Sequence, residues 1–379
     1  MRSLTTAREV CERHQPGLLA ALESLSFAER EATGSPAVAR LREHGGAGLL
    51  VPVEYGGQGA DVLDAVRVQR AVGAVSPSLA AASTMHHFTV AMLFELATDA
   101  SRLTPAQTKV LHGIAPERLL LASGWAEGRT QQNILIPSVT ATETEGGFLL
   151  NGAKKPCSLA RSMDVLTASI AVPGADGTPE LALALLPADS PGLSVHPFWG
   201  NEVLAASESE EVRLTDVFVP QELVVRTVPE APHLLDDLQT TGFVWFELLI
   251  CAGYAGAATA LAATVLERGR GSSGDRAALA VRVESAFALL EGAARAVRDG
   301  LDGEAAVAEV LVARYAAQET LVQAADQALD LLGGIDFVRG GEHTRLADSV
   351  RPLVFHPPGR ASAAEPLLQW FAGGALELS

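Results

Sequence analysis

Apolar residues recur at helical spacing near both ends of the chain and alternate with polar residues in the middle. Alanine, leucine, glutamate and arginine follow an amphipathic order in Ala7–Leu25 and Ser35–His44. Helical patterns return at Val62–Val75 and Ser83–Leu96. From residue 234 onward the pattern is again helical and rich in alanine, over residues 257–268, 276–300 and 305–332. The two ends therefore predict a helical domain and an antiparallel helical bundle.

The middle of the chain has a different pattern. From Leu119 to about Val225, Thr, Val, Ile and Leu alternate, and Gly-Gly, Asn-Gly, Pro-Gly and Asp-Gly turns separate the segments. The expected strands are residues 139–144, 148–152, 165–172, 181–186 and 209–214. This spacing predicts a small β-barrel or sandwich. The expected fold class is therefore α+β, with a helical domain over residues 1–118, a β-domain over 119–228 and a helical bundle over 229–379.

Composition and charge exclude several classes of protein and ligand. Of the 379 residues 48% are hydrophobic and 19% are charged, so the chain can bury a large core. The net charge of −17 argues against nucleic-acid binding. Three cysteines without paired spacing indicate neither disulfides nor a metal site. We find no signal peptide, and residues 243–263, the most apolar run, fit a buried helix better than a membrane span. A cytoplasmic protein is expected.

Strong turn signals surround a single histidine near the C-terminus. Gly333 and Gly334 end a helix, because glycine tolerates the left-handed conformation at such ends. The next segment ends at His356, which two prolines follow. Proline forbids continuation of a helix and favours an extended backbone at the residue before it. The sequence thus fixes the place of one imidazole.

Several motifs, in this order along the chain, resemble those of the acyl-CoA dehydrogenase superfamily of flavoproteins. They are GLLVPVEYGGQGAD (48–61), GGFLLNGAKKPCSLARSMDVL (146–166), VRLTDVFVPQELV (212–224), GYAGAATALAATVLERG (253–269) and QALDLLGGIDFVR (327–339). The resemblance implies three domains (an N-terminal helical domain, a middle β-barrel and a C-terminal four-helix bundle), a bound FAD, and a homodimer or homotetramer. A flat isoalloxazine ring between the β-domain and the bundle agrees with the preference of ligands for domain junctions.

The resemblance also assigns flavin contacts. The hydroxyl of Ser158 would face the flavin N5, with Trp125, Ala126 and Cys157 beside it. Arg268, or Arg270 if the loop is shifted, would hold the pyrophosphate with a bidentate grip. The backbone at Leu332, Gly333 and Gly334 would touch the FAD of the neighbouring subunit.

Two residues are candidates for the catalytic base. Glu247 aligns with the glutamate that some branches carry on the first bundle helix, and burial among aromatic residues would raise its pKa. His356 aligns with the glutamate of the segment Y-E-G-T, and an imidazole exchanges protons near neutral pH. The alternatives are structural: a helix-surface carboxylate for Glu247, and a loop histidine paired with Asp348 or Glu342.

The chain also departs from the family pattern. Residues 126–133 keep Glu127 of the loop T-E-P-x-x-G-S-D but lack its Gly-Ser-Asp, and Pro156 stands where an aromatic residue often flanks the flavin. Residues 269–284 lack the usual F-G…Q. Binding of coenzyme A is therefore less secure than binding of flavin.

Three functions agree with these observations. The first is α,β-dehydrogenation of an acyl thioester on coenzyme A or a carrier protein, with Glu247 or His356 as the base and flavin N5 accepting a hydride. The second is hydroxylation of a small molecule, with His356 as the base, by a flavin-dependent monooxygenase that takes electrons from a flavin reductase. Arg351 and the sequence His-Pro-Pro resemble the "H-D-P" segment of that branch. The third is a non-catalytic subunit of a hetero-oligomer.

Overall fold

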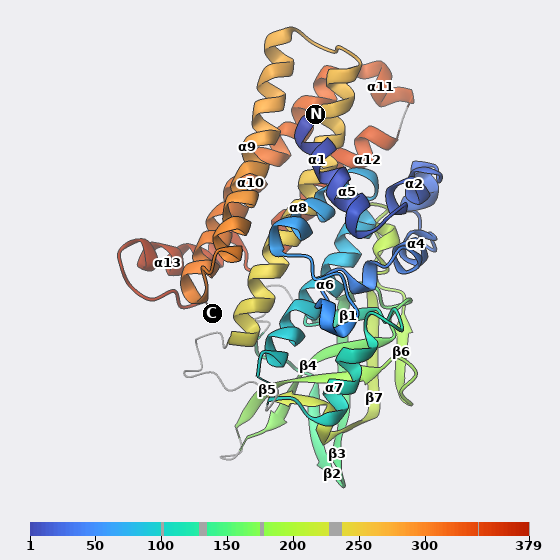
Figure 1. The fold of residues 1–379 in the computed structure, drawn as a ribbon, viewed down its shortest axis with the longest axis vertical. Coiled ribbons are helices and arrows are strands. Elements are labelled where there is room, and N and C mark those ends of the chain that lie inside the picture. The colour runs from blue at the N-terminus through green and yellow to red at the C-terminus, as the bar shows by residue number, and fades with distance from the viewer. Residues whose placement is uncertain (100–101, 129–134, 175–177, 227–236, 340, 379) are drawn as a thin grey trace.

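The N-terminal part of the computed structural model is helical (Figure 1). The structure describes residues 1–99, 102–128, 135–174, 178–226, 237–339 and 341–378. Helix α5 begins after Asp61, whose carboxylate accepts the Asp64 N–H, and α6 begins after Ser76, whose hydroxyl accepts the Leu79 N–H. The helices are α1 (Arg2–His14), α2 (Leu18–Glu23), α3 (Phe27–Glu31), α4 (Ala37–Glu43), α5 (Val62–Val75), α6 (Pro77–Ala97) and α7 (Pro105–Gly113), with short 3-10 turns η1 (Gly46–Gly48) and η2 (Val53–Tyr55).

The middle part is one mixed sheet of eight strands in the order β6-β7-β3-β2-β4-β5-β8, with β1 beside β4. Strand β4 pairs in parallel with β1 and β2, and the other ladders are antiparallel. The strands are β1 (Leu121–Gly124), β2 (Thr140–Thr144), β3 (Gly147–Cys157), β4 (Val165–Pro173), β5 (Pro179–Pro187), β6 (Leu193–His196), β7 (Glu210–Pro220) and β8 (Val224–Arg226), with turns η4 (Ala205–Ser207) and η5 (Gln221–Leu223).

The sheet curves on itself, since β1 contacts β3 and β5 contacts β7 across the sheet order. Within the described residues, no ladder joins the terminal strands β6 and β8. The expected β-domain is therefore confirmed as a curved mixed sheet. Strands β1, β6 and β8 are not among the strands expected from alternation, because runs of three or four residues are too short to show it.

The C-terminal part consists of three long helices and several short ones. Helix α8 packs against α5, α6 and α10, and the short helix α12 fills a further position against α8 and α10. The elements are α8 (Asp237–Glu267), α9 (Ser273–Arg298), α10 (Gly303–Leu332), α11 (Gly334–Arg339), α12 (Glu342–Asp348), η6 (Arg351–Phe355) and α13 (Arg360–Phe371). The domain boundary expected near residue 118 falls between α7 and β1, and the one expected near residue 228 lies outside the described residues. Both boundaries stay predictions.

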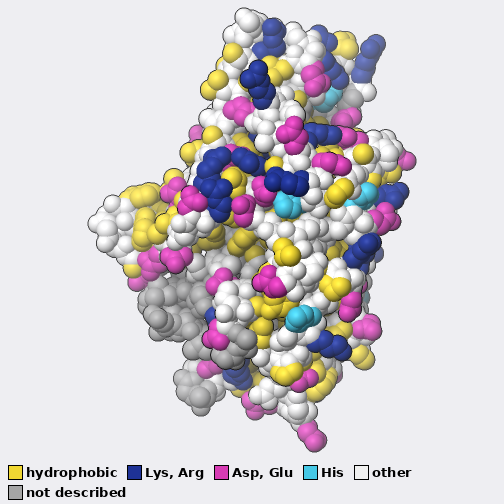
Figure 2. All heavy atoms as spheres, in the orientation of Figure 1, with side chains coloured by type: hydrophobic (Ala, Val, Ile, Leu, Met, Phe, Trp, Pro, Cys, Tyr) yellow, Lys and Arg dark blue, Asp and Glu magenta, His cyan; other side chains and the backbone are white. Residues whose placement is uncertain are grey.

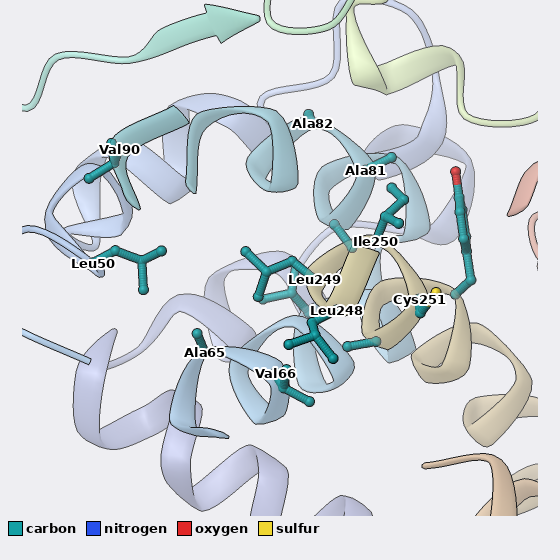
Figure 3. Packing of buried hydrophobic residues seen from close by; sticks show 14 of the residues in the cluster. Leu50, Ala65, Val66, Ala81, Ala82, Val90, Leu248, Leu249, Ile250 and Cys251 are labelled. Atoms are coloured by element: carbon teal, nitrogen blue, oxygen red, sulfur yellow. The ribbon is translucent and has the colours of Figure 1, made fainter. Parts of the chain in front are cut away.

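Helix α8 is the centre of the molecule. Leu248, Leu249 and Ile250 of α8 pack with α5 and α6 side chains (Figure 3). Glycines allow the close crossing of α5 and α8, because a Cβ added at Gly73 would lie 2.0 Å from the carbonyl oxygen of Gly253.

One stretch of α8, Leu238–Glu267, is long and apolar enough to span a membrane, but 89% of its most apolar window is buried in the fold. It is therefore a core helix, as the sequence predicts, and the cytoplasmic location stays a prediction. On the outer face shown in Figure 2, acidic and basic side chains are interspersed.

Candidate functional site

His356 lies against one face of α8. Its backbone is extended (φ −70°, ψ 138°), as the two following prolines predict. The Nε2 atom is 2.9 Å from the hydroxyl oxygen of Tyr254, and the ring packs edge-on against Phe246 at a centroid distance of 5.6 Å. Phe246 and Tyr254 are about two helical turns apart, so both point to the same side of α8. Phe88 of α6 packs against Phe246, and we refer to Phe88, Phe246 and Tyr254 together as the aromatic wall.

The imidazole of His356 is held in its neutral form. Burial, followed by the charge of Arg314, lowers its pKa to about 3. Its partner is the hydroxyl of Tyr254, in place of the pairing with Asp348 or Glu342 that we had considered. At neutral pH, therefore, the ring can exchange hydrogen bonds but carries no charge.

Glu247 is a buried carboxylate in an ion pair. Its Oε1 atom is 2.7 Å from Nη1 of Arg314 on α10, and the two side chains are 0% and 1% exposed. Burial raises the pKa of Glu247 to about 7, against the opposing effect of Arg314. The predicted rise in pKa is confirmed, while the alternative of a helix-surface carboxylate is wrong. The role of Glu247 as a base stays a prediction.

Arg314 fastens the turn that carries His356. Its guanidinium donates to the carbonyl oxygens of Leu353 (3.3 Å), His356 and Pro357 (3.2 Å). The sequence analysis missed Arg314, because its ionic partner is 67 residues away in sequence. The one available signal was an arginine inside an apolar helical pattern, where an unpaired charge would be costly.

Ser158 follows the end of β3 and is half-buried. Its Oγ lies 2.8 Å from the Oγ of Ser209, which lies 2.7 Å from the Oγ of Ser207. The preceding Cys157 is buried and its thiol contacts the carbonyl oxygen of Ser123 at 3.5 Å. Helix α6 packs against η4, which contains Ser207, and against α8. Helix α6 thus contacts both the turn that contains Ser207 and the helix that carries Phe246 and Tyr254.

Trp125 and Ala126 lie at the edge of the sheet. The Nε1 atom of Trp125 is buried and has no hydrogen-bond partner within the described residues, while the Ala126 carbonyl accepts the Lys155 N–H at 2.8 Å. Glu127 accepts a hydrogen bond from Nζ of the fully buried Lys154 at 2.7 Å. Lys154 is thus a second buried cation that the sequence analysis missed. The loop that departs from the family motif falls largely within residues 129–134, which lie outside the described residues.

The expected pyrophosphate and backbone contacts form a separate group. Arg268 pairs with Asp336 of α11 at 2.6 Å, and Arg270 is exposed. Gly333 has the positive φ of 83° expected after a helix, and α10 ends at Leu332. In Figure 1, α11 lies at the opposite end of the molecule from the sheet. Within one chain this group therefore lies apart from the sheet that carries Ser158. The pyrophosphate contact of Arg268 or Arg270, and the contact of Leu332, Gly333 and Gly334 with a neighbouring subunit's FAD, stay predictions.

Two neighbouring histidines on α6, His86 and His87, are buried. His86 accepts the Leu121 N–H at Nδ1 (3.1 Å) and contacts the Ala47 carbonyl through Nε2 (2.9 Å). His87 is 1% exposed and its Nδ1 has no partner among the described residues. Burial lowers the pKa of both, that of His86 to about 4. The described residues also contain no group of three His, Cys, Asp or Glu able to hold a metal ion.

Comparison with known proteins places this geometry in a family. The model of the acyl-CoA dehydrogenase N-terminal domain matches residues 4–104. The chain is 60% identical over 378 residues, 100% of both chains, to isobutylamine N-hydroxylase of Streptomyces viridifaciens. It is 30% identical over 204 residues, 52% of this chain and 47% of the relative, to dibenzothiophene monooxygenase of Rhodococcus qingshengii.

Solved structures agree on the fold. KijD3, in complex with FMN and dTDP-3-amino-2,3,6-trideoxy-4-keto-3-methyl-D-glucose, superposes with a TM-score of 0.86 at 21% identity, covering 98% of this chain and 95% of that one. The helical, sheet and helical parts thus have the same arrangement in both proteins. The chain belongs to the acyl-CoA dehydrogenase superfamily of flavoenzymes.

Proposed function

We propose that the chain is a flavin-dependent N-hydroxylase of small aliphatic amines. The observation that carries the proposal is the 60% identity to isobutylamine N-hydroxylase along the whole chain. Among the functions considered from sequence, this similarity supports hydroxylation of a small molecule above dehydrogenation of an acyl thioester. It also speaks against a non-catalytic subunit.

The residues present fit a flavin. The buried Nε1 of Trp125 lacks a partner among the described residues, and Ser158 is half-buried. A Cβ built at Gly333 or Gly334 would meet no non-neighbouring atom within 4 Å, which leaves room for close approach to the backbone. FAD is consistent with this fold, and FMN has the same ring. Reduced flavin, when bound, supplies the two electrons that allow O2 to yield one hydroxyl group on the amine nitrogen and one water.

The site suits an amine in its neutral form, whose lone pair can react. Burial and the charge of Arg314, which lower the pKa of His356 to about 3, also disfavour an alkylammonium beside the ring. The buried carboxylate of Glu247 is paired with Arg314, so it offers an ammonium little compensation. In our proposal, the aromatic wall holds the alkyl group and His356 positions the amine by hydrogen bonding.

A second candidate function is dehydrogenation of an acyl thioester. One observation favours it: Glu247 has a pKa of about 7, and its Oε2 has no partner among the described residues. Such a carboxylate has the proton affinity of a useful base. Its full burial and its ion pair count against access to a substrate.

One experiment separates the two functions. The purified protein is incubated with a flavin reductase, NADH, FAD, O2 and isobutylamine, and the product is analysed by mass spectrometry. We expect the mass of the amine plus one oxygen, and no bleaching of flavin by acyl-CoA under anaerobic conditions. Flavin reduction by an acyl-CoA without the reductase would instead establish dehydrogenation as the function and contradict the proposed N-hydroxylation.

A further inference from the structure

Three serine hydroxyls form a chain that ends at a backbone carbonyl. Ser158 contacts Ser209 at 2.8 Å, and Ser209 contacts Ser207 at 2.7 Å. Ser207 donates to the carbonyl oxygen of Leu204 at 2.7 Å. Ser207 is 1% exposed and Ser209 is 5% exposed, so bulk water does not compete for these bonds.

The number of protons fixes the direction of the chain. The three contacts require three protons, and each hydroxyl supplies one. The Leu204 carbonyl oxygen accepts only, so Ser207 must give its proton there. Ser209 then donates to Ser207, and Ser158 donates to Ser209. Reversing the direction would forfeit the hydroxyl bond to Leu204 and leave one fewer buried hydrogen bond.

The scaffold around the chain keeps this arrangement. The Leu159 N–H donates to the Ser207 carbonyl at 3.1 Å, and the Ala160 N–H donates to the Glu208 carbonyl at 3.2 Å. Of the neighbouring carboxylates, that of Glu208 accepts the Ser162 hydroxyl at Oε1 and has no partner at Oε2 among the described residues, and that of Glu210 pairs with Arg161. The carboxylate bonds found for these two residues therefore leave the serine protons to one another.

We propose that Ser207 and Ser209 are positioning residues that hold Ser158 as a hydrogen-bond acceptor, so that the site prefers reduced over oxidised flavin. The inference rests on the proposed function and on the contact between the Ser158 hydroxyl and the flavin N5 that the family resemblance implies. With its proton committed to Ser209, Ser158 has only lone pairs left for a ligand. The N5 of reduced flavin carries a hydrogen and can donate to them, whereas the N5 of oxidised flavin is itself an acceptor. Such a preference suits an enzyme that takes reduced flavin from a reductase.

The test compares the dissociation constants of the two redox states. Oxidised and reduced FAD, and then FMN, are titrated into the full chain, the reduced forms under anaerobic conditions. The ratio of the constants for oxidised and reduced flavin should exceed one in the unmodified protein. Ser209→Ala frees the Ser158 proton for oxidised flavin, so this ratio should fall about fivefold. Ser209→Thr keeps a hydroxyl and should preserve the ratio.

Two further variants make the result decisive if Ser209→Ala does not fold. Ser207→Ala removes the acceptor of Ser209, which can then donate to Ser158, and Ser158→Ala removes the contact itself. Both should lower the ratio. Ser190→Ala, which loses a hydroxyl bond to the Pro187 carbonyl at the surface, is the control and should leave it unchanged.

The outcomes distinguish the inference from the proposed function. Equal weakening of both redox states in the Ser207 and Ser209 variants would show a purely structural role and overturn the inference. An unchanged ratio in folded variants would overturn it as well. If the unmodified protein binds neither FAD nor FMN, the proposed function itself fails.

Discussion

At the scale of single residues, burial moves two titratable groups in opposite directions. The pKa of Glu247 rises to about 7 and that of His356 falls to about 3, because a site of low polarity disfavours the charged form of each. The fixed charge between them is that of Arg314, which compensates Glu247 and repels a proton on His356. As a result, the imidazole of His356 is neutral and lies beside the aromatic wall.

Loss of the imidazole should remove activity without removing the fold. In His356→Gln the flexible amide does not hold its polar atoms where the imidazole nitrogen lies, so the amine is misplaced and we expect the rate of amine hydroxylation to fall about 100-fold. Product formation measures the effect, and thermal unfolding checks the fold. His196→Gln, on β6, is the matched control and should keep full activity. A His356→Gln enzyme with normal turnover would remove His356 from the site.

Buried histidines should make the protein sensitive to acid. The folded-state pKa values of His86 and His356, about 4 and 3, lie below the ordinary value of 6.5. Between these values the unfolded chain binds more protons than the folded one, so the free energy of unfolding should decrease as the pH falls from about 6.5 toward 4. Glu247, with a raised pKa, acts in the opposite direction.

Urea unfolding at several pH values measures this dependence. The decline with acid should be shallower in His356→Gln, because one of the histidines with a lowered pKa is then absent. An equally steep decline in the variant would mean that His356 does not contribute.

At the scale of elements, α8 brings the candidate site together. One helix supplies Phe246, Glu247 and Tyr254, and α10 adds Arg314, which fastens the turn after η6. The sequence analysis found Glu247 and His356 because each stands out within its own segment. It could not find Arg314, Ser207 or Ser209, since their roles depend on contacts between segments far apart in sequence.

Breaking the ion pair should cost stability. Glu247→Gln leaves the buried guanidinium of Arg314 without a counter-charge, so we expect the free energy of unfolding to fall by about 3 kcal/mol. Glu319→Gln, at an exposed pair with Arg360, is the control and should change it by less than about 1 kcal/mol. Urea unfolding of both variants measures the two changes in the free energy of unfolding. A loss of activity at unchanged stability would favour Glu247 as a base over a positioning role.

The crossing of α5 and α8 should tolerate no side chain. Gly73→Ala would place a Cβ 2.0 Å from the Gly253 carbonyl oxygen, and the required helix shift should cost about 3 kcal/mol. Gly292→Ala, on α9 with no atom within 4 Å, should instead stabilise the helix by about 0.5 kcal/mol. Thermal melts of the two variants provide the comparison, and similar melting temperatures would contradict this account of the crossing.

At the scale of the whole molecule, the order of helical and strand patterns was enough to predict the architecture. Val62–Val75 is helical over the full range that its periodicity indicates. The long strands β3 to β5 also appear where alternating residues and turn signals predict them. Pairing partners could not be predicted, because periodicity shows which face of an element is buried but not what covers it.

We propose that α11 lies in an interface between copies of the chain. Ile335, Phe337 and Val338 are 69%, 68% and 79% exposed, an apolar group that a lone soluble chain seldom shows. They follow Gly333 and Gly334, where the family resemblance implies contact with a neighbouring subunit. Replacing the three residues by serine should lower the molar mass found by light scattering. As the control, Val281→Ser on α9 should not alter it, and a mass unaffected by the triple change would exclude this interface.

The hydrogen bonds from Arg314 to three carbonyl groups limit how a substrate can reach the site. Because Leu353, His356 and Pro357 are tied to α10 and α8 through one guanidinium, this turn cannot swing aside without stranding a buried cation. The turn is therefore a rigid part of the site. We expect this turn to keep its position when an amine enters the site.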